Sequence, residues 1–378
     1  MTHFVLLCCK CDRRHAADMT TLACEHCGTP LDVAYDASAP RYLRGRHDMP
    51  LPLMDPNSAL TLGEGNTPLV PLPAIAAEVG LDSLQGKLEF VAPTGSYKDR
   101  GAAVMIAVAR EQGVTEVVED SSGNAGAAVS AYAARSGIKA HIFAPATASA
   151  AKVSQIRIYG AEVHSIEGSR DDTADAAVAY SRDNDIVYAS HAWSPYFPEG
   201  TKSFAYEVVD QLDGLAPDHV VFPVGNGGLL LGACFGFREL LAAGHIDSMP
   251  RLHAVQSQSV MPLVEGMAGR EWDSSTATPT VAGGISVVAP VRGAQVIDTL
   301  RATGGSAVAV LDEDILRMQQ LLASGEGVFA EPTSAAAFAG LKLLVQDGAI
   351  KRDDLTVVAV TGFGLKDKLP ELKTGSGV

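Results

Sequence analysis

The chain has 378 residues, of which 47% are hydrophobic and 19% are charged, and its formal net charge at pH 7 is −15. This composition is that of a globular protein with room for two domains, and it excludes the disordered and fibrous classes. The acidic balance argues against binding to nucleic acid or to an anionic membrane. No apolar run approaches the length of a membrane span, and the apolar run at residues 4–9 is too short for a signal peptide, so we expect a cytoplasmic protein.

The first predicted unit is a cysteine-rich segment over residues 1–35. Cys8-x-x-Cys11 and Cys24-x-x-Cys27 are separated by twelve residues, and two such turns bring four thiolates to one tetrahedral ion. This spacing predicts a zinc ribbon, and four cysteine ligands leave no open position, so the zinc would be structural. The alternatives are a redox-active or buried cysteine pair and a nucleic-acid-binding module, but the flanking residues are not strongly basic.

The body of the chain alternates strand patterns with helix patterns after residues 33–60, which are interpreted as an arm or linker. We expect strands at residues 87–91, 116–120, 139–145, 161–166, 185–190, 219–224, 252–256, 307–310 and 355–360. We expect helices at residues 101–110, 126–135, 149–159, 172–183, 201–212, 229–242, 312–323 and 333–346. This repeated order predicts an α/β fold with parallel sheets and helices on both faces.

Lys98 lies between the first of these strands and the helix pattern that starts at residue 101, in the run Pro-Thr-Gly-Ser-Tyr-Lys-Asp-Arg-Gly over residues 93–101. The start of a helix disfavours a second positive charge, so a lysine there loses its proton more easily. A neutral lysine amine is suited to Schiff-base chemistry. Taken alone, the same lysine is more simply explained as a solvated surface charge.

Two further turns from strand to helix offer ligand-binding groups. Gly225-Asn226-Gly227-Gly228 presents successive backbone N–H groups at a helix start, which is the chemistry of a phosphate cradle, with an ordinary tight connection as the alternative. Ser121-Ser122-Gly123-Asn124 adds hydroxyls and an amide at another helix start, which suits a carboxylate. Asn124 also fits the role of a helix cap.

These motifs, in this order, resemble those of the threonine synthase family of fold-type-II pyridoxal-phosphate enzymes, from the cysteine ribbon to the segment Thr-Gly-Phe-Gly-Leu-Lys-Asp over residues 361–367. The resemblance implies two three-layer α/β domains of the tryptophan synthase β-like architecture, plus the N-terminal zinc ribbon. It implies a large cofactor-binding domain over residues 36–101 and 209–378 and a small mobile domain over residues 102–208. It also implies a homodimer.

The resemblance also assigns roles to single residues. Lys98 is expected to bind pyridoxal 5'-phosphate as a Schiff base and then to move protons, and Asn124 is expected to contact the ring oxygen. Thr361 is expected to contact the ring nitrogen, and a hydroxyl there favours elimination or replacement at the substrate side chain. The cofactor phosphate is expected at Gly225, Asn226, Gly227 and Gly228. The residues expected to contact the substrate are Thr67, Ser121, Ser122, Gly123 and Lys202.

Two segments depart from the family pattern. Phe363 stands where these synthases commonly carry a histidine, and residues 190–203 retain Lys202 but lack the usual asparagine and arginine that help to hold a substrate phosphate. This segment instead carries an aromatic set that would suit a less anionic side chain or pack between the domains: Trp193, Tyr196 and Phe197. His191 is more simply a structural histidine than a substrate contact, and Glu331 is expected to shape the site and cap the following helix.

The resemblance therefore implies a carbon–oxygen lyase that converts O-phosphohomoserine and water to threonine and phosphate. The alternative is an ammonia-lyase or β-replacement enzyme for serine-like, threonine-like or activated amino acids, because both share every cofactor motif. A third hypothesis is a zinc-ribbon binding protein on an inactive scaffold, against which the intact Lys98, Asn124 and Thr361 argue. The expected partner is a small amino-acid substrate, not nucleic acid or a membrane.

Overall fold

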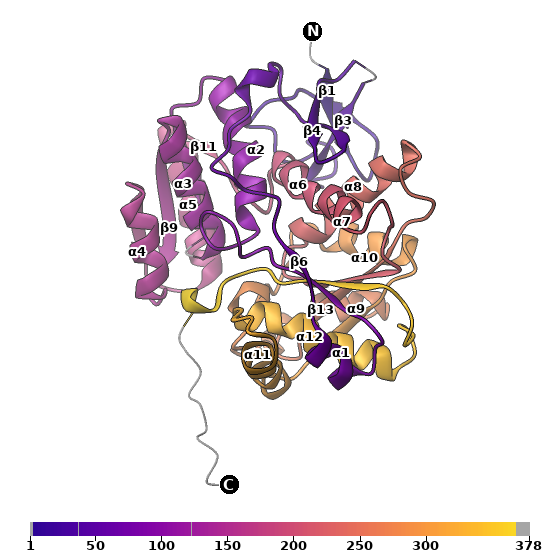
Figure 1. Ribbon diagram of the computed structural model, residues 1–378. Coiled ribbons are helices and arrows are strands. Elements are labelled where there is room, and N and C mark those ends of the chain that lie inside the picture. The colour runs from indigo at the N-terminus through magenta and orange to yellow at the C-terminus, as the bar shows by residue number, and fades with distance from the viewer. Residues whose placement is uncertain (1–2, 37, 122, 368–378) are drawn as a thin grey trace.

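The computed structural model describes residues 3–36, 38–121 and 123–367. Two mainly parallel sheets with helices on both faces form the body of this part of the chain, and a small cysteine-rich sheet lies at the N-terminal end (Figure 1). The α/β fold predicted from the alternating sequence patterns is confirmed.

The larger sheet has six strands in the order β14-β13-β12-β15-β7-β6, all parallel except for β6 against β7. Its central strands β12 and β15 are apolar and buried, as expected for a parallel sheet between two helix layers. The strands are β6 (Leu69–Pro71), β7 (Gln85–Lys87), β12 (His219–Pro223), β13 (Arg251–Ser257), β14 (Ala307–Val310) and β15 (Thr356–Ala359). The helices are α1 (Pro73–Val79), α8 (Gly228–Ala242), α9 (Pro262–Met267), α10 (Gly293–Ala302), α11 (Asp312–Glu326) and α12 (Pro332–Gln346).

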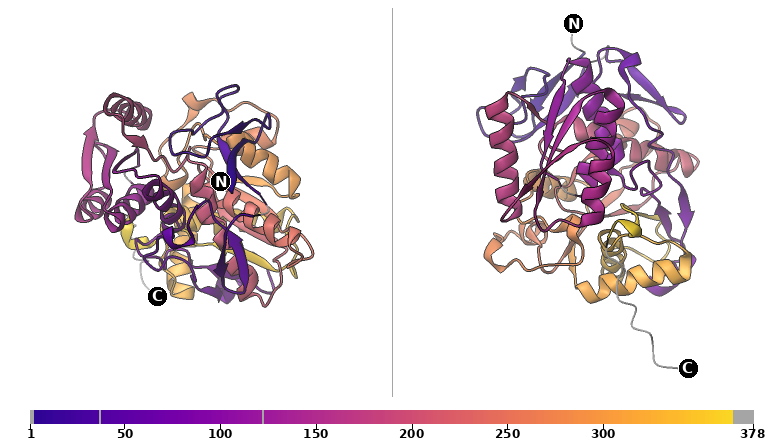
Figure 2. Two further views of the ribbon diagram at one scale, coloured as in Figure 1. Left: turned by 90° about the horizontal axis from the view of Figure 1, so that it is seen from above. Right: turned by 90° about the vertical axis from the view of Figure 1, so that its left-hand side faces the viewer.

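The smaller sheet has four parallel strands in the order β10-β9-β8-β11. These are β8 (Glu116–Glu119), β9 (Lys139–Pro145), β10 (Glu162–Ile166) and β11 (Val187–Tyr188), and the helices between them are α3 (Asn124–Ser136), α4 (Ala150–Ile158) and α5 (Arg170–Asn184). The right-hand view of Figure 2 shows helices on both sides of this sheet. The strands and helices expected between residues 116 and 184 are therefore present within a few residues of their predicted ends.

The N-terminal sheet is antiparallel and has the order β2-β1-β3, formed by β1 (Phe4–Cys8), β2 (Arg14–His15) and β3 (Leu31–Tyr35). A hairpin of β4 (Arg41–Arg44) and β5 (His47–Pro50) follows, and its turn contains Gly45 at φ +57°. The segment predicted as an arm or linker over residues 33–60 therefore contains regular structure, including the end of β3 and this hairpin. Met49 anchors the hairpin, since it is buried in the main hydrophobic core.

Helix α2 (Lys98–Glu111) begins at Lys98 and packs against α6 (Tyr196–Thr201). Two glycines allow the backbones to approach closely. A Cβ on Gly101 would lie 2.5 Å from the Phe197 ring, and a Cβ on Gly200 would lie 1.9 Å from the carbonyl oxygen of Arg100. This close packing fixes the first turn of α2, and with it the backbone of Lys98.

A buried ion cluster holds the same turn from the other side. Arg100 donates to Glu89 at 2.6 Å through Nε and to Glu207, on α7 (Ser203–Gln211), at 2.7 Å through Nη1. Lys87, at the end of β7, donates to Glu207 at 2.9 Å. All four side chains are buried, so removal of one would leave an uncompensated charge in the interior.

This cluster explains the main error in the predicted elements. The strand expected over residues 87–91 ends at Lys87, because the chain turns there and carries the Glu89 carboxylate inward to Arg100. The predicted domain boundaries stay predictions. Within the described residues, no helix is both long enough and apolar enough to cross a membrane.

Candidate active site

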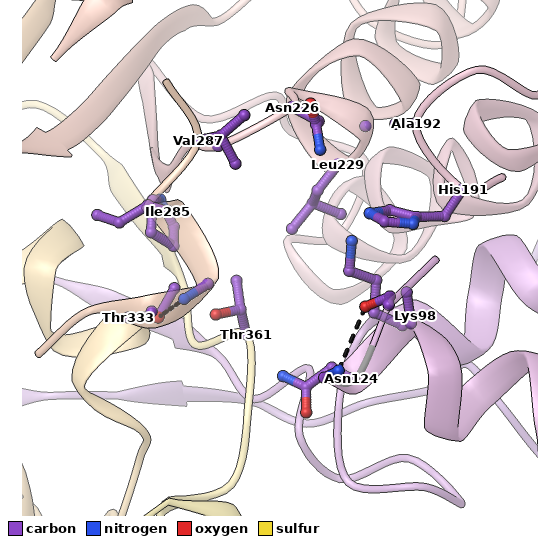
Figure 3. A pocket seen from close by; sticks show the side chains of 18 of the residues that line it. Lys98, Asn124, His191, Ala192, Asn226, Leu229, Ile285, Val287, Thr333 and Thr361 are labelled. Atoms are coloured by element: carbon purple, nitrogen blue, oxygen red, sulfur yellow. Dashed lines mark hydrogen bonds between the residues drawn. The ribbon is translucent and has the colours of Figure 1, made fainter. Parts of the chain in front are cut away.

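A cavity of about 290 Å³ lies where the carboxyl ends of both sheets meet. Residues that follow β8, β12 and β15 line it, which is the position where α/β sheets bind ligands. Figure 3 shows the side chains that enter it, with Lys98, Asn124 and Thr361 around the open space. Every predicted cofactor-binding residue lines this cavity: Lys98, Asn124, Gly225, Asn226, Gly227, Gly228 and Thr361.

Lys98 reaches the cavity from the first position of α2. Its Nζ lies 4.9 Å from the ring centroid of Tyr97 and 5.5 Å from that of Phe197. In Figure 3 the amine points into the open space towards the ring of His191. Lys98 is therefore a half-buried cavity residue and not a solvated surface charge, and its role in binding the cofactor stays a prediction.

The glycine turn after β12 forms a cradle at the start of α8. A Cβ on Gly225 would lie 2.9 Å from the carbonyl oxygen of Gly284, and Gly227 has φ +87° with an added Cβ 2.3 Å from Val296. Side chains are therefore excluded, and the backbone itself faces the cavity. Because α8 begins at Gly228, the unpaired N–H groups of its first turn and its dipole favour an anion such as phosphate.

Glu331 connects the two residues predicted to contact the cofactor ring. It accepts from Nδ2 of Asn124 at 3.0 Å and from the hydroxyl of Thr361 at 3.2 Å. Burial raises the pKa of the Glu331 carboxyl. The residue precedes α12, but its side chain does not cap that helix, so the capping part of its predicted role was wrong and the site-shaping part is confirmed.

The turn after β8 lies beside Lys98 at the start of α3. Ser121 and Gly123 line the cavity, and the hydroxyl of Ser121 accepts from the backbone N–H of Gly123 at 3.3 Å. The N-terminus of α3 faces the same space, which suits a substrate carboxylate. Ser122, also predicted to contact the substrate, lies outside the described residues.

Two predicted substrate contacts lie elsewhere. Thr67 is buried in the ion cluster, where its hydroxyl donates to Glu89 at 2.8 Å and accepts from Arg100 at 3.1 Å. Lys202 is fully buried and donates to Glu199 at 2.6 Å, so its charge is already neutralised. Neither residue lines the cavity, and the prediction that they bind substrate is corrected accordingly.

The rest of the cavity wall combines apolar and charged side chains from segments that are distant in sequence. Phe197 lines it as one of the predicted aromatic set, whereas Tyr196 turns away and donates to the backbone of Asp18 at 2.9 Å. His191 also faces the cavity, contrary to its interpretation as a structural histidine. The cavity residues that sequence reasoning missed include Asp120, Lys152, Arg170, Ile285, Val287, Arg292 and Thr333. Of these, Asp120 and Thr333 had a usable signal, because Asp120 ends a predicted strand and Thr333 begins a predicted helix.

The four N-terminal cysteines converge outside this cavity. Sγ of Cys8 lies 3.5 Å from Sγ of Cys27, Cys11 lies 3.7 Å from Cys24, and Cys27 lies 3.9 Å from Cys11. A tetrahedron with Zn–S bonds of about 2.3 Å has S···S edges of about 3.8 Å. The geometry therefore fits a four-coordinate ion with no open position.

The lysine at a helix start, the glycine turn and the Thr361 hydroxyl thus meet in one cavity, which is the arrangement expected of a pyridoxal-phosphate site. The chain belongs to the family described as "Pyridoxal-phosphate dependent enzyme", whose model matches residues 60–362. The cavity fits this cofactor by its own geometry, since a Cβ would fill the cradle and the buried Oδ1 of Asn124 has no partner among the described residues.

Within this family the chain is similar to threonine synthases. It is 36% identical to the threonine synthase of Methanocaldococcus jannaschii over 375 residues, covering 95% of this chain and 92% of that one. It is also 36% identical to that of Methanosarcina acetivorans over 373 residues, covering 96% and 92%. The fold is shared with a fungal L-serine ammonia-lyase from Rhizomucor miehei, with a TM-score of 0.70, 22% identity and coverage of 79% of this chain and 94% of that one. At that identity the likeness shows the fold alone.

Proposed function

We propose that this protein is a pyridoxal-phosphate-dependent carbon–oxygen lyase of the threonine synthase type, which acts on the side chain of an amino acid. The proposed reaction is the conversion of O-phosphohomoserine and water to threonine and phosphate. The single observation that carries the proposal is the convergence of Lys98, the Gly225–Gly228 cradle and Thr361 on one cavity. The similarity to threonine synthases over 95% of the chain supports it.

The residues of the chain divide the work between binding and proton transfer. The bound cofactor supplies an electron sink for the carbanion that forms when the substrate loses its α-proton. Lys98 would hold the cofactor through its Nζ, and the same amine, when free, would remove the α-proton of the substrate. Ser121, Gly123 and the N-terminus of α3 bind the substrate carboxylate and so orient the α-carbon. The apolar side chains of the wall exclude water from the reacting atoms.

The test is an assay of the cofactor-loaded protein with O-phosphohomoserine, measuring phosphate and threonine together. Equal amounts of both products support the threonine synthase reaction. Production of neither, while the visible absorbance of the cofactor still changes with serine or threonine, would rule this substrate out. Absence of any lysine-bound absorbance, or a spectrum unchanged in Lys98→Ala, would favour the binding protein on an inactive scaffold.

The second candidate is an ammonia-lyase or β-replacement enzyme, and the composition of the cavity wall favours it. Phe197, Leu229 and Val287 line the cavity, in which a phosphorylated side chain would need cationic or amide donors. Lys152 and Arg170 also line the cavity. Lys152 is paired with Asp367 at 2.5 Å, which neutralises one of these two cations. Release of a keto acid and ammonia, without phosphate, would identify this activity.

The cysteine cluster is proposed to hold a structural zinc ion that supports the cavity from a distance. Arg292 lines the cavity and donates to the ribbon at Asp32 and at the carbonyl oxygen of Leu31, both at 2.8 Å. Folding of the ribbon around zinc would fix these acceptors. Metal analysis of the purified protein should give one zinc per chain. The homodimer and the cytoplasmic location stay predictions.

A further inference from the structure

The ring of His191 lies on the cavity wall close to the amine of Lys98 (Figure 3). Its Nδ1 is 2.7 Å from Oε1 of Glu119, and its backbone N–H donates to Oε2 of the same carboxyl group at 3.0 Å. One buried carboxyl group thus fixes both the backbone and the ring of His191. With Nδ1 engaged in this way, Nε2 is the ring atom left for a ligand in the cavity.

The surroundings determine where the protons of this pair lie. Burial raises the pKa of Glu119 to about 8, although Lys98 and Arg170 act to lower it. Burial and Lys98 hold the pKa of His191 well below its usual value, which Asp120 acts to raise. The charged and titratable groups that face the pair are therefore Lys98 from α2, Arg170 from α5, Asp120 after β8 and Tyr188 from β11.

Below about pH 8 the pair carries the extra proton. If that proton stays on Glu119, the carboxyl donates to Nδ1 and the ring's own proton is on Nε2. If it moves to Nδ1, the ring is an imidazolium beside a carboxylate, and Nε2 is protonated again. In both arrangements Nε2–H faces the cavity as a hydrogen-bond donor.

Such a donor matches a hydroxyl leaving group. Hydroxide is a poor leaving group, and a positioned acid accelerates its departure by about 10²- to 10⁴-fold. Ala192, Phe197 and Leu229 add apolar surface to the cavity wall, which suits a small uncharged side chain. The aromatic edge-on contact of His191 with Phe197, at 5.9 Å between centroids, holds the ring in the same orientation.

We propose that His191, oriented by Glu119, is a further catalytic residue of this site, which donates a proton to the departing hydroxyl group when a 3-hydroxy amino acid is dehydrated. The proposal rests on the second candidate function above, the ammonia-lyase reaction, and on the removal of the α-proton by Lys98. As the carbon–oxygen bond breaks, its electron pair goes to the oxygen and the Nε2 proton follows, so that water leaves. The electron pair of the former α-C–H bond closes the new carbon–carbon double bond. The Glu119 proton moves to Nδ1, and the pair regains its lost proton from solvent.

The test compares two substrates that give the same products. L-serine loses hydroxide, whereas β-chloro-L-alanine loses chloride, which needs no proton, and both give pyruvate and ammonia. His191→Gln keeps an amide donor but supplies no proton, so we expect pyruvate formation from serine to fall by about 10²-fold or more. Formation from β-chloro-L-alanine should stay within about threefold, as should exchange of the serine α-proton with solvent deuterium. His245→Gln, at an exposed histidine that does not line the cavity, is the matched control and should leave both reactions unchanged.

Glu119→Gln separates orientation from proton supply. Its amide oxygen accepts from the backbone N–H of His191 and its amide N–H donates to Nδ1, so Nε2–H is kept. With serine, the wild-type rate should fall as pH rises through about 8, where Glu119 loses its proton. Glu119→Gln should lower the rate and remove this alkaline limb. In the unliganded protein, the ¹⁵N shift of His191 Nε2 should report a protonated nitrogen at pH 7.

Each outcome decides between the proposals. Equal losses with serine and β-chloro-L-alanine in His191→Gln would overturn the acid role, as would a bare Nε2 at pH 7. Wild-type protein that eliminates chloride but never dehydrates serine would also overturn it. Wild-type protein that fails even to exchange the α-proton of serine would instead contradict the chemistry assigned to Lys98.

Discussion

The contact between Gly362 and Glu331 gives a prediction that can be worked out from the structure. A Cβ at residue 362 would lie 2.3 Å from Cδ of Glu331 and 2.4 Å from each of its oxygens. Glu331 is only 3% exposed and accepts hydrogen bonds from both Asn124 and Thr361. It cannot retreat without breaking at least one of these bonds. Gly362→Ala should therefore disturb the residues that orient the cofactor ring while leaving Lys98 and the phosphate cradle intact.

Two terms set the size of the effect. Forcing one methyl group into a packed interior costs about 1–3 kcal/mol, and this applies to the unliganded protein. Each displaced hydrogen bond is worth about 1 kcal/mol, and this loss appears when the cofactor binds to a misaligned Asn124 or Thr361. Since 1.4 kcal/mol corresponds to a factor of ten, we expect cofactor affinity to fall by about 10-fold.

The assay is titration of the unliganded protein with pyridoxal phosphate, followed by visible absorbance, together with thermal melting. Gly283→Ala is the matched control, because Gly283 lines the same cavity but an added Cβ there meets nothing within 4 Å. The control should bind the cofactor and melt as the wild type does. Unchanged affinity and melting in Gly362→Ala would show that Glu331 does not position the ring contacts.

Three further predictions concern stability. Arg100→Met leaves the buried Glu89 and Glu207 without their guanidinium partner and should lower the free energy of unfolding in urea by about 3–5 kcal/mol. The control Arg110→Met, at the exposed end of the same helix, should lower it by under about 1 kcal/mol. Similar losses in the two variants would contradict the role given to the ion cluster. Burial acts to raise the pKa of Glu207, but Arg100 and Lys87 hold it below its usual range. Its contribution to stability is therefore present above the unfolded pKa of about 4.3 and is lost as pH falls below that value, and circular dichroism should show a smaller loss over that range in Arg100→Met. Removal of zinc by a chelator should lower the melting temperature, and activity should return with zinc; full stability without metal would refute the structural ion.

The sequence predicted the candidate site correctly where the groups involved come from neighbouring residues. Lys98 at a helix start, the glycines of residues 225–228 and Asn124 at the head of α3 were all predicted from short motifs, because a cradle or a helix N-terminus is made by neighbouring residues. The paired Cys-x-x-Cys turns are local in the same sense. The structure brings these distant motifs to their expected places through the parallel order of the strands.

Prediction failed where a role depends on tertiary neighbours. Thr67 and Lys202 match family positions, yet both are engaged by charged side chains of distant helices, Thr67 by Arg100 of α2 and Lys202 by Glu239 of α8. Ile285 and Val287 line the cavity from an irregular segment without periodicity. The end of β7 at Lys87 likewise depends on the ion pair between Arg100 and Glu89, which no local pattern around residue 87 indicates.

Two buried carboxyl groups, Glu331 and Glu119, hold residues that line the cavity. Glu331 accepts hydrogen bonds from Asn124 and Thr361, and Glu119 is hydrogen-bonded to both the ring and the backbone N–H of His191. Burial raises the pKa of both carboxyls, and a hydrogen-bonded carboxyl group in a dry interior holds its partners in one geometry. Asn124 and Thr361 are thereby fixed for the cofactor ring and His191 for the substrate side chain. If this division is correct, Glu119→Gln should alter the reaction with serine without altering cofactor affinity, and Gly362→Ala should alter cofactor affinity first.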